Sequence, residues 1–114
     1  MYTINRSLVI IRPKQPFIDW ANQLPDAEWV STLDDFKTDC LVILTPEYES
    51  DEEAVGYINE MYEDIFFEEL CGWCTDESWW PHDRTKEMFW QWFEVELHSI
   101  VKDPHTDPIE RLDY

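Results

Sequence analysis

The sequence predicts a small α+β domain in which two or three strands pack against about three helices. Two short apolar runs, at 7–12 and 40–45, contain β-branched residues and are closed by prolines, which is typical of buried strands. A longer segment, 51–71, repeats apolar residues at helical spacing behind a clear start signal. The chain has 114 residues, the size of one domain, and shows neither a repeat nor a linker. We therefore expect residues 1–114 to form a single domain with an irregular tail at 103–114.

The first unit is a strand followed by a short helix. Residues 7–12 form a continuous apolar run that ends at Pro13. Pro16 suits the first position of a helix, because an N–H at that position has no partner within the helix. Pro25 ends the pattern. The apolar stripe between these prolines lies at i, i+3, i+4 and i+7 and consists of Phe17, Trp20, Ala21 and Leu24.

The middle of the chain contains a short turn and a second strand. Thr32 is placed to cap a single turn over residues 33–36. Residues 40–45 are mostly apolar and are closed by Pro46, so we predict a second buried strand. Cys40 fits at the head of this strand as a small apolar filler.

The clearest predicted element is a helix over residues 51–71. Ser50 and Glu53 have the spacing of a capping box, in which each side chain accepts a hydrogen bond from the other residue's backbone N–H. Gly72 follows the last periodic residue, at a position where a left-handed helix terminus is common. The apolar stripe comprises Ala54, Val55, Ile58, Met61, Tyr62, Ile65, Phe66 and Leu70.

An aromatic loop at 72–83 leads to a third helix, for which Asp83 is the predicted cap. Beyond Glu94 the pattern fits both a continued helix and a strand over 94–102. We predict a helix to about Phe93 and then a third strand, because two strands alone form a weak sheet. The stripe of this helix consists of Met88, Phe89, Trp92 and Phe93.

The charge of the chain is strongly negative and uneven. The sequence has 26 acidic and 8 basic residues, a formal net charge of −18. The first 25 residues hold three basic residues and one acid, whereas the remainder holds five basic residues and 25 acids. Nucleic-acid backbones and anionic membranes repel such a chain, so we expect it to bind neither directly. A basic protein partner fits this charge.

The predicted helix at 51–71 carries one acidic face without Lys or Arg at i+4. Like charges at this spacing repel, so the face is either a solvated surface, a docking surface for a basic partner or a divalent-cation site. The calcium-loop pattern that would favour the cation is absent. The acidic residues of this face are Glu52, Glu53, Glu60, Glu63, Asp64 and Glu68.

Seven tryptophans are more than a domain of this size easily buries. Trp73, Trp79 and Trp80 lie in the aromatic loop, where each is a candidate interface anchor beside the acidic face. The alternative is that the loop folds back onto the sheet as a lid. Trp90 lies off the stripe of the third helix. Of the remaining tryptophans, the pattern places Trp20, Trp29 and Trp92 in the core.

Two sets of residues have the composition of a metal site. Cys71 and Cys74 have C-x-x-C spacing, and His82 follows, but the sequence contains no second such pair. A redox role is disfavoured, because the motif ends a helix and the negative end of the helix dipole disfavours a thiolate. The second set alternates along the third predicted strand, where a polar outer face is the competing interpretation; it consists of Glu94, Glu96 and His98.

The sequence also predicts a cytoplasmic location. It contains no apolar run long enough to cross a membrane and no signal peptide, and its three cysteines are an odd number. No catalytic triad, phosphate-binding loop or H-E-x-x-H motif is present, so we predict no cofactor and favour a non-enzymatic protein while leaving an enzyme open.

Four short segments of the chain carry a resemblance to other proteins. The opening N-R-S at 5–7, the segment R-P-K-Q-P-F-I-D-W at 12–20, W-W-P at 79–81 and W-F-E at 92–94 are similar to a group of small acidic bacterial proteins of unknown function. The resemblance spans most of the chain and implies a bacterial, cytosolic, single-domain protein. It implies no catalytic or binding residue.

The leading hypothesis is a non-enzymatic, regulatory protein that docks a basic partner, such as a nucleic-acid-binding protein, through its acidic and tryptophan-rich surface. The alternative is a small metal-binding protein or metal-dependent enzyme that uses one of the two candidate sets. The sequence does not establish an oligomeric state. An accessory subunit that uses the tryptophan loop as its interface is a third interpretation.

Overall fold

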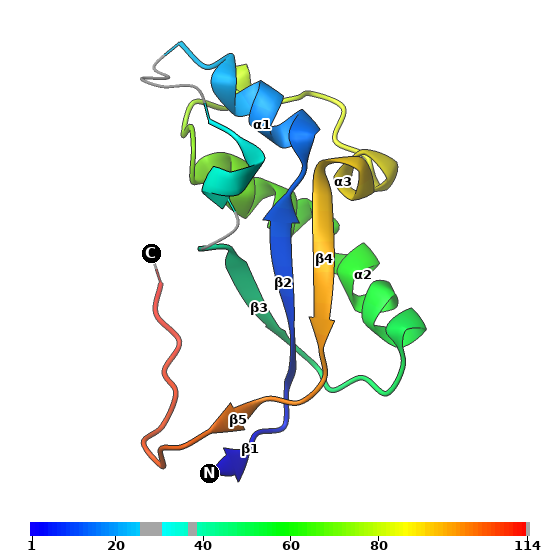
Figure 1. Cartoon of the computed structure of the whole chain (residues 1–114), viewed down its shortest axis with the longest axis vertical. Helices are drawn as coiled ribbons and strands as arrows, with labels where there is room; N and C mark the ends of the chain where they lie inside the picture. Colours follow the sequence, from blue (N-terminus) through cyan, green and yellow to red (C-terminus); the bar gives the residue numbers. More distant parts are fainter. Residues whose placement is uncertain (26–30, 37–38, 114) are drawn as a thin grey trace.

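Strand β2 (Ser7–Pro13) lies at the centre of a three-stranded antiparallel sheet (Figure 1). It pairs with β3 (Leu41–Thr45) on one side and with β4 (Phe93–His98) on the other. The structure is a computed structural model that describes residues 1–25, 31–36 and 39–113. The α+β class and the third strand predicted from the sequence are both confirmed.

The inner face of the sheet is apolar. Val9 and Ile11 on β2 are fully buried. Val9 lies opposite Ile43 on one neighbouring strand and Leu97 on the other. This alternation of buried and partly exposed residues along β2 is expected of a sheet with one covered face.

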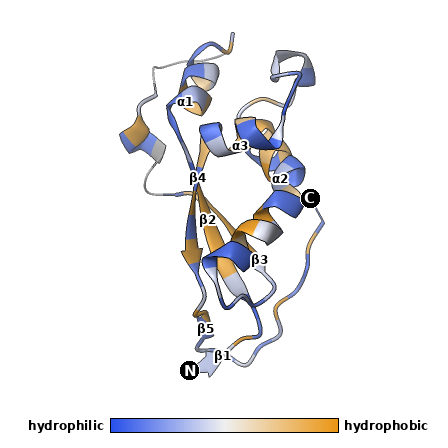
Figure 2. Cartoon of the chain, turned by 90° about the vertical axis from the view of Figure 1, so that its right-hand side faces the viewer, coloured by the Kyte–Doolittle hydropathy of each residue, from blue (hydrophilic) through white to orange (hydrophobic). Residues whose placement is uncertain are grey.

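Three helices cover the inner face and one end of the sheet. Helix α2 (Asp51–Cys71) crosses the inner face, as Figures 1 and 2 both show. The short helices α1 (Gln15–Asn22) and α3 (Lys86–Trp92) lie at the end where β2 finishes and β4 begins. The Lys14 N–H donates to the Trp92 carbonyl at 2.7 Å and ties these two connections together.

The core beneath the sheet is built from aromatic rings. Phe66 on α2 contacts Trp92 and Phe93, with ring centroids 5.6 and 5.3 Å apart. Phe89 on α3 lies 6.2 Å from Phe66, and Phe17 on α1 lies 5.3 Å from Phe93. One aromatic cluster therefore joins all three helices to the start of β4.

A second, minimal sheet joins the N-terminal segment to the residues that follow β4. Strand β1 (Tyr2–Thr3) pairs antiparallel with β5 (Lys102–Asp103). The Lys102 ammonium group also donates to the Thr3 hydroxyl. Because β5 includes Asp103, the irregular segment begins one residue later than predicted. The described residues from 104 to 113 contain no helix or strand.

Several helix ends differ in detail from the prediction. Ser50 accepts the Glu53 N–H at 3.1 Å as expected, but the Glu53 carboxylate accepts the Glu49 N–H instead of that of Ser50. Gly72 does not adopt the left-handed conformation expected of it; it is right-handed, with φ −64°. Its N–H donates to the Glu68 carbonyl, so the chain leaves the helix without a left-handed residue.

The caps of the shorter helices also differ from the prediction. Thr85, and not Asp83, caps α3, because its hydroxyl accepts the Met88 N–H at 3.1 Å. Helix α1 begins at Gln15, which places Pro16 at its second position. The turn η1 (Leu33–Phe36) forms as predicted, but Thr32 does not cap it with its own side chain. The Asp35 carboxylate accepts the backbone N–H of Thr32 at 2.8 Å.

Strand β3 is less buried than its composition suggests. Val42 and Leu44 are 52 and 47% exposed, so the prediction of a fully buried strand is wrong. The reason is its position at the edge of the sheet, where one face of the strand packs on the core and the other remains uncovered. Cys40, the predicted filler, is partly buried just before this strand.

Gly56 gives a first prediction about stability. It lies in the interior of α2 with helical neighbours on both sides, and a Cβ added to it meets no atom within 4 Å. We expect Gly56→Ala to raise the free energy of unfolding by about 0.5–1 kcal/mol, because alanine has less backbone entropy to lose. Urea unfolding followed by circular dichroism measures this change. An unchanged or lowered free energy of unfolding would contradict this prediction.

Candidate partner-binding surface

The acidic residues singled out in the sequence lie exposed along α2. The helix has 21 residues, so it spans about 30 Å, and the acids are distributed over its whole length. Within the described residues, none of these carboxylates forms an ion pair with Lys or Arg. We call this surface the α2 acidic face; its members are Glu52, Glu53, Glu60, Glu63, Asp64 and Glu68.

Repulsion within the α2 acidic face is only partly relieved by local hydrogen bonds. Asp64 lies four residues from both Glu60 and Glu68, the spacing at which like charges destabilise a helix. The Tyr62 hydroxyl donates to Glu63 at 3.2 Å, and the Tyr57 hydroxyl does the same for Glu53. These bonds leave the charges in place, so the face keeps a strong negative potential.

Phe67 is a residue of this face that the sequence interpretation missed. It is 44% exposed although it is a phenylalanine, and it lies between Asp64 and Glu68 on the outward side of α2. Its ring meets that of Trp80 edge to face, with centroids 5.4 Å apart. The available signal was its position outside the apolar stripe, because an aromatic residue off the stripe is left facing solvent.

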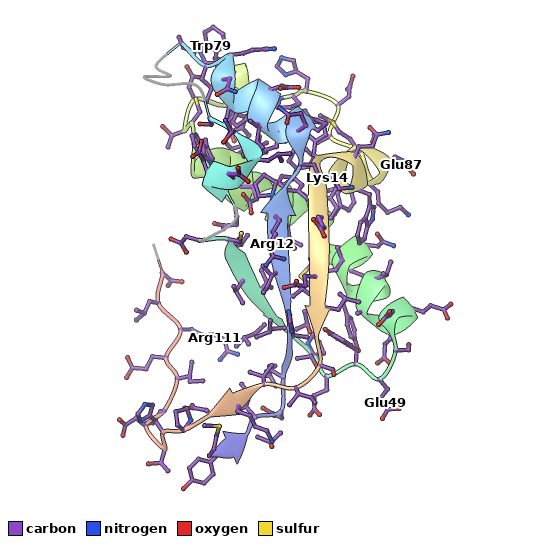
Figure 3. The ribbon with its side chains drawn as sticks, viewed as in Figure 1. Arg12, Lys14, Glu49, Trp79, Glu87 and Arg111 are labelled. Atoms are coloured by element: carbon purple, nitrogen blue, oxygen red, sulfur yellow. The ribbon has the colours of Figure 1, made fainter. Side chains whose placement is uncertain are left out.

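The tryptophan loop divides into exposed and buried members. Trp73 and Trp79 are 41 and 50% exposed, and Figure 3 shows Trp79 at the end of the molecule beside α1. Trp80 is only 3% exposed, so its prediction as an exposed anchor is wrong. Its indole N–H donates to the Cys74 carbonyl at 2.7 Å, and the Arg84 guanidinium lies over its ring. This part of the loop therefore forms a lid against Phe67 on α2, whereas the alternative interpretation had placed the lid on the sheet.

The lid is held in place by local contacts. The Asp76 carboxylate accepts the N–H and hydroxyl of Ser78 at the start of the turn η2 (Glu77–Trp79), and these bonds lower the pKa of Asp76. The Trp20 indole N–H donates to the Trp79 carbonyl at 2.8 Å. A buried tryptophan of α1 therefore fixes the backbone of the exposed one.

The other tryptophans are part of the core or its border. Trp92 packs against Phe66, as the sequence predicts. Trp90, off the stripe in the sequence, is partly buried, and its indole N–H donates to Asn59 on α2 at 2.8 Å. Trp29, predicted to be core, lies outside the described residues.

The cysteine set is not arranged around a common point. All three cysteines lie in the described part of the chain, and none forms a disulfide. Cys71 and Cys74 pack against the hydrophobic core, and the Cys74 thiol faces the Asp76 carbonyl at 3.7 Å. His82 is exposed on the loop. Across residues 1–25, 31–36 and 39–113, no three His, Cys, Asp or Glu side chains are placed to hold a metal ion.

The second candidate set forms an ion-pair ladder on the outer face of the sheet. The Glu96 carboxylate contacts the His98 Nε2 at 2.8 Å and the Arg12 guanidinium at 3.1 Å. Hydrogen bonds from His98 and Arg12 lower the pKa of Glu96 and keep it ionised. Glu94 lies opposite Arg12 in the strand register. The arrangement is thus a polar outer face, the competing interpretation for this strand.

Three of the described basic side chains donate hydrogen bonds to backbone carbonyls. The excess of acid favours their pairing with carboxylates, but within the described residues only Arg12 forms such an ion pair. Lys14 donates to the Trp90 carbonyl at 2.9 Å, Arg6 to the Asn5 carbonyl and Arg84 to the Pro81 carbonyl. The Lys and Arg side chains that the structure describes therefore form no ion pair with the α2 acidic face.

Glu69 is a second residue that the sequence interpretation missed. It follows Ile65 by four residues, so it lies on the apolar stripe of α2 and not on the acidic face. Burial raises its pKa from 4.5 to about 7, and its Oε1 atom has no hydrogen-bond partner. The spacing from Ile65 was the signal, because an acid in register with buried residues is itself drawn into the fold.

Two further findings bear on the candidate surface. No helix within the described ranges has the length and apolar character needed to cross a membrane. The resemblance to small acidic bacterial proteins stays a prediction. Comparisons of the chain with known protein families, with curated proteins and with solved structures gave no match.

Proposed function

We propose that this chain is a non-enzymatic interaction protein that docks a basic protein partner through the α2 acidic face. The observation that carries the proposal is a row of exposed carboxylates, about 30 Å long, that the chain's own Lys and Arg side chains do not neutralise within the described residues. A cationic surface on a partner would relieve the repulsion between these carboxylates. The opposite charges would also attract the two proteins over long range and speed their association.

Aromatic side chains beside the acids favour a protein interface over a merely solvated face. Phe67 lies within the face, and Trp73 follows the end of α2. Exposed aromatic residues of this kind act as interface anchors, because they bury a large area at low entropic cost. Trp79 extends the surface toward α1, whereas the buried Trp80 supports the loop from beneath.

The shape of the surface suggests which basic partner fits. A straight row of negative charge on a helix resembles the charge pattern of a nucleic-acid backbone more than that of a compact ligand. We therefore propose that the partner is a nucleic-acid-binding protein whose cationic groove the helix occupies. The proposal places the chain in the cytoplasm and assigns it neither cofactor nor direct nucleic-acid contact.

A charge reversal on α2 tests this proposal. We expect the variant with Glu60→Lys, Glu63→Lys and Asp64→Lys to bind its basic partner on the order of tenfold more weakly, because each exposed contact contributes about 0.2–1 kcal/mol. Partners are captured from nuclease-treated lysate at about 50 mM salt, and the purified partner is then titrated at about 50 and 500 mM. Binding should weaken at the higher salt.

A matched control distinguishes the effect of the α2 acidic face on binding from the effect of net charge. The variant with Asp107→Lys, Glu110→Lys and Asp113→Lys changes the charge equally on the irregular tail, and we expect it to bind like the parent chain. Equal losses in both variants would assign the effect to net charge and contradict docking on α2. Retention of no basic protein at the lower salt would remove the proposed function altogether.

A further inference from the structure

A pocket of about 400 Å³ opens beside the C-terminal end of α2. Its described walls come from three parts of the sequence: Pro13 at the end of β2, the residues around η1 and the start of β3, and the end of α2 with the residues that follow it. The volume falls within the range of about 300–1,000 Å³ that is usual for small-ligand sites. The lining residues that matter below are Asp35, Asp39, Cys40, Glu68, Glu69 and Trp73.

The pocket combines an acidic interior with an aromatic wall. Four of its lining residues are acids, and the described lining contains no Lys, Arg or His. Asp35 is held in place, because its carboxylate accepts the N–H and hydroxyl of Thr32. Trp73 supplies a flat ring that is 41% exposed. Such a lining suits a cation on an apolar stem, which gains from both charge and ring contact.

Glu69 marks the inner end of this site. Its Oε1 atom is buried without a hydrogen-bond partner, and the side chain lines the pocket. A buried carboxylate without a partner is unfavourable, and the protein interior raises its pKa to about 7. A cation entering the pocket would supply the missing partner and stabilise the ionised form.

We propose that this pocket binds one arginine side chain of a basic protein partner, with the guanidinium group against Glu69 and the stem against Trp73. Arginine fits better than lysine, because the guanidinium group is planar, stacks on aromatic rings and is weakly hydrated. The inference deepens the proposed function and rests on it for the source of the arginine, since the pocket shares Glu68 and lies at the end of the α2 acidic face.

Among the described basic residues, Arg12 lies beside the pocket, because its guanidinium interacts with the Cys40 thiol, which is one of the lining residues. Its guanidinium pairs with Glu96 on the outer face of the sheet at 3.1 Å. The titratable groups that surround Glu69 are Glu68 on α2, Asp35 on η1, and Asp39 and Cys40 before β3. Burial raises the pKa of the Cys40 thiol, the Arg12 guanidinium opposes this effect, and the Glu69 charge adds to it. The Cys40 thiol is therefore within electrostatic reach of both Arg12 and Glu69.

The test uses a defined probe and not a partner. N-acetyl-arginine amide is titrated into ¹⁵N-labelled protein at pH 8, with N-acetyl-citrulline amide as the neutral isostere. We expect saturable shifts at Glu69, Gly72 and the Trp73 indole with the arginine probe alone. Glu69→Gln should weaken binding about tenfold, whereas Glu110→Gln, which changes an acid on the irregular tail, should leave it unchanged. Lowering the pH to 6 should weaken binding by protonating Glu69.

The possible outcomes distinguish a failure of the arginine site from a failure of the proposed function. Equal shifts from the citrulline probe, shifts centred on Glu60, or no saturation at about 50 mM probe would overturn the arginine site. Capture of a basic protein by the parent chain would still stand in that case. Binding of the arginine probe without capture of any basic protein would instead retain the pocket and remove the docking function.

Discussion

Phe66→Ala is expected to lower the free energy of unfolding by about 3–5 kcal/mol. The Phe66 ring is fully buried and contacts Phe89, Trp92 and Phe93, which belong to α3 and β4. Removing the ring leaves a cavity among large rigid side chains that cannot easily move together. The loss is a large share of the stability of a small domain, which is about 5–15 kcal/mol. Urea unfolding followed by tryptophan fluorescence measures it.

Phe67 provides a matched control on the next residue of the same helix. It is 44% exposed and makes its ring contact with Trp80. We expect Phe67→Ala to cost about 1 kcal/mol or less, because most of the removed surface was already in water. Equal losses for both substitutions would contradict the assignment of Phe66 to the core and Phe67 to the surface. Partner binding, by contrast, should respond to Phe67→Ala.

The strands and the long helix were predictable because their signals are local. The residues of β2 and the capping pair of α2 carry their information within a few positions, and Ser50 does accept the Glu53 N–H. The transition from α3 to β4 at Phe93 was also predictable, because a two-stranded sheet would have been marginal. Each of these inferences needed only neighbouring residues and a simple stability argument.

The candidate site depended on contacts that local patterns do not contain. The sequence places Trp73, Trp79 and Trp80 in one loop, but the burial of Trp80 depends on its packing in the core cluster, which local patterns do not contain. The exposure of Val42 follows from the edge position of β3, which is a property of the whole sheet. The pocket around Glu69 was the least predictable feature, since its walls come from three separate parts of the sequence.

Glu69→Gln is expected to raise the free energy of unfolding by about 3 kcal/mol at pH 8 and to leave it almost unchanged at pH 4. The Glu69 pKa rises from 4.5 in the unfolded chain to about 7 in the folded protein. A tenfold change in a proton affinity corresponds to about 1.36 kcal/mol, which gives this magnitude. Glutamine keeps the size and polarity of the side chain and removes its charge. Urea unfolding at each pH measures the difference.

The sign follows from which state holds the proton. Below about pH 4.5 both states of the parent chain are protonated at Glu69, so its ionisation has no effect on stability. Between about 4.5 and 7 only the unfolded chain releases the proton, and stability falls as the pH rises; above about 7 the full penalty is present. The substituted chain has no such transition, so the two stability curves should separate across this window.

A charge-matched substitution on the neighbouring residue decides whether burial is the cause. Glu68→Gln removes one charge from the exposed side of α2, and we expect a change within about 0.5 kcal/mol at both pH values. A gain for Glu69→Gln that is the same at pH 4 and pH 8 would exclude ionisation as its origin. A loss at pH 8 would show that the carboxylate already has a cationic partner in the folded chain. The gain expected here therefore sets an upper limit on the free energy that an arginine guanidinium group could recover by pairing with Glu69 in the pocket, because the guanidinium group also loses hydration.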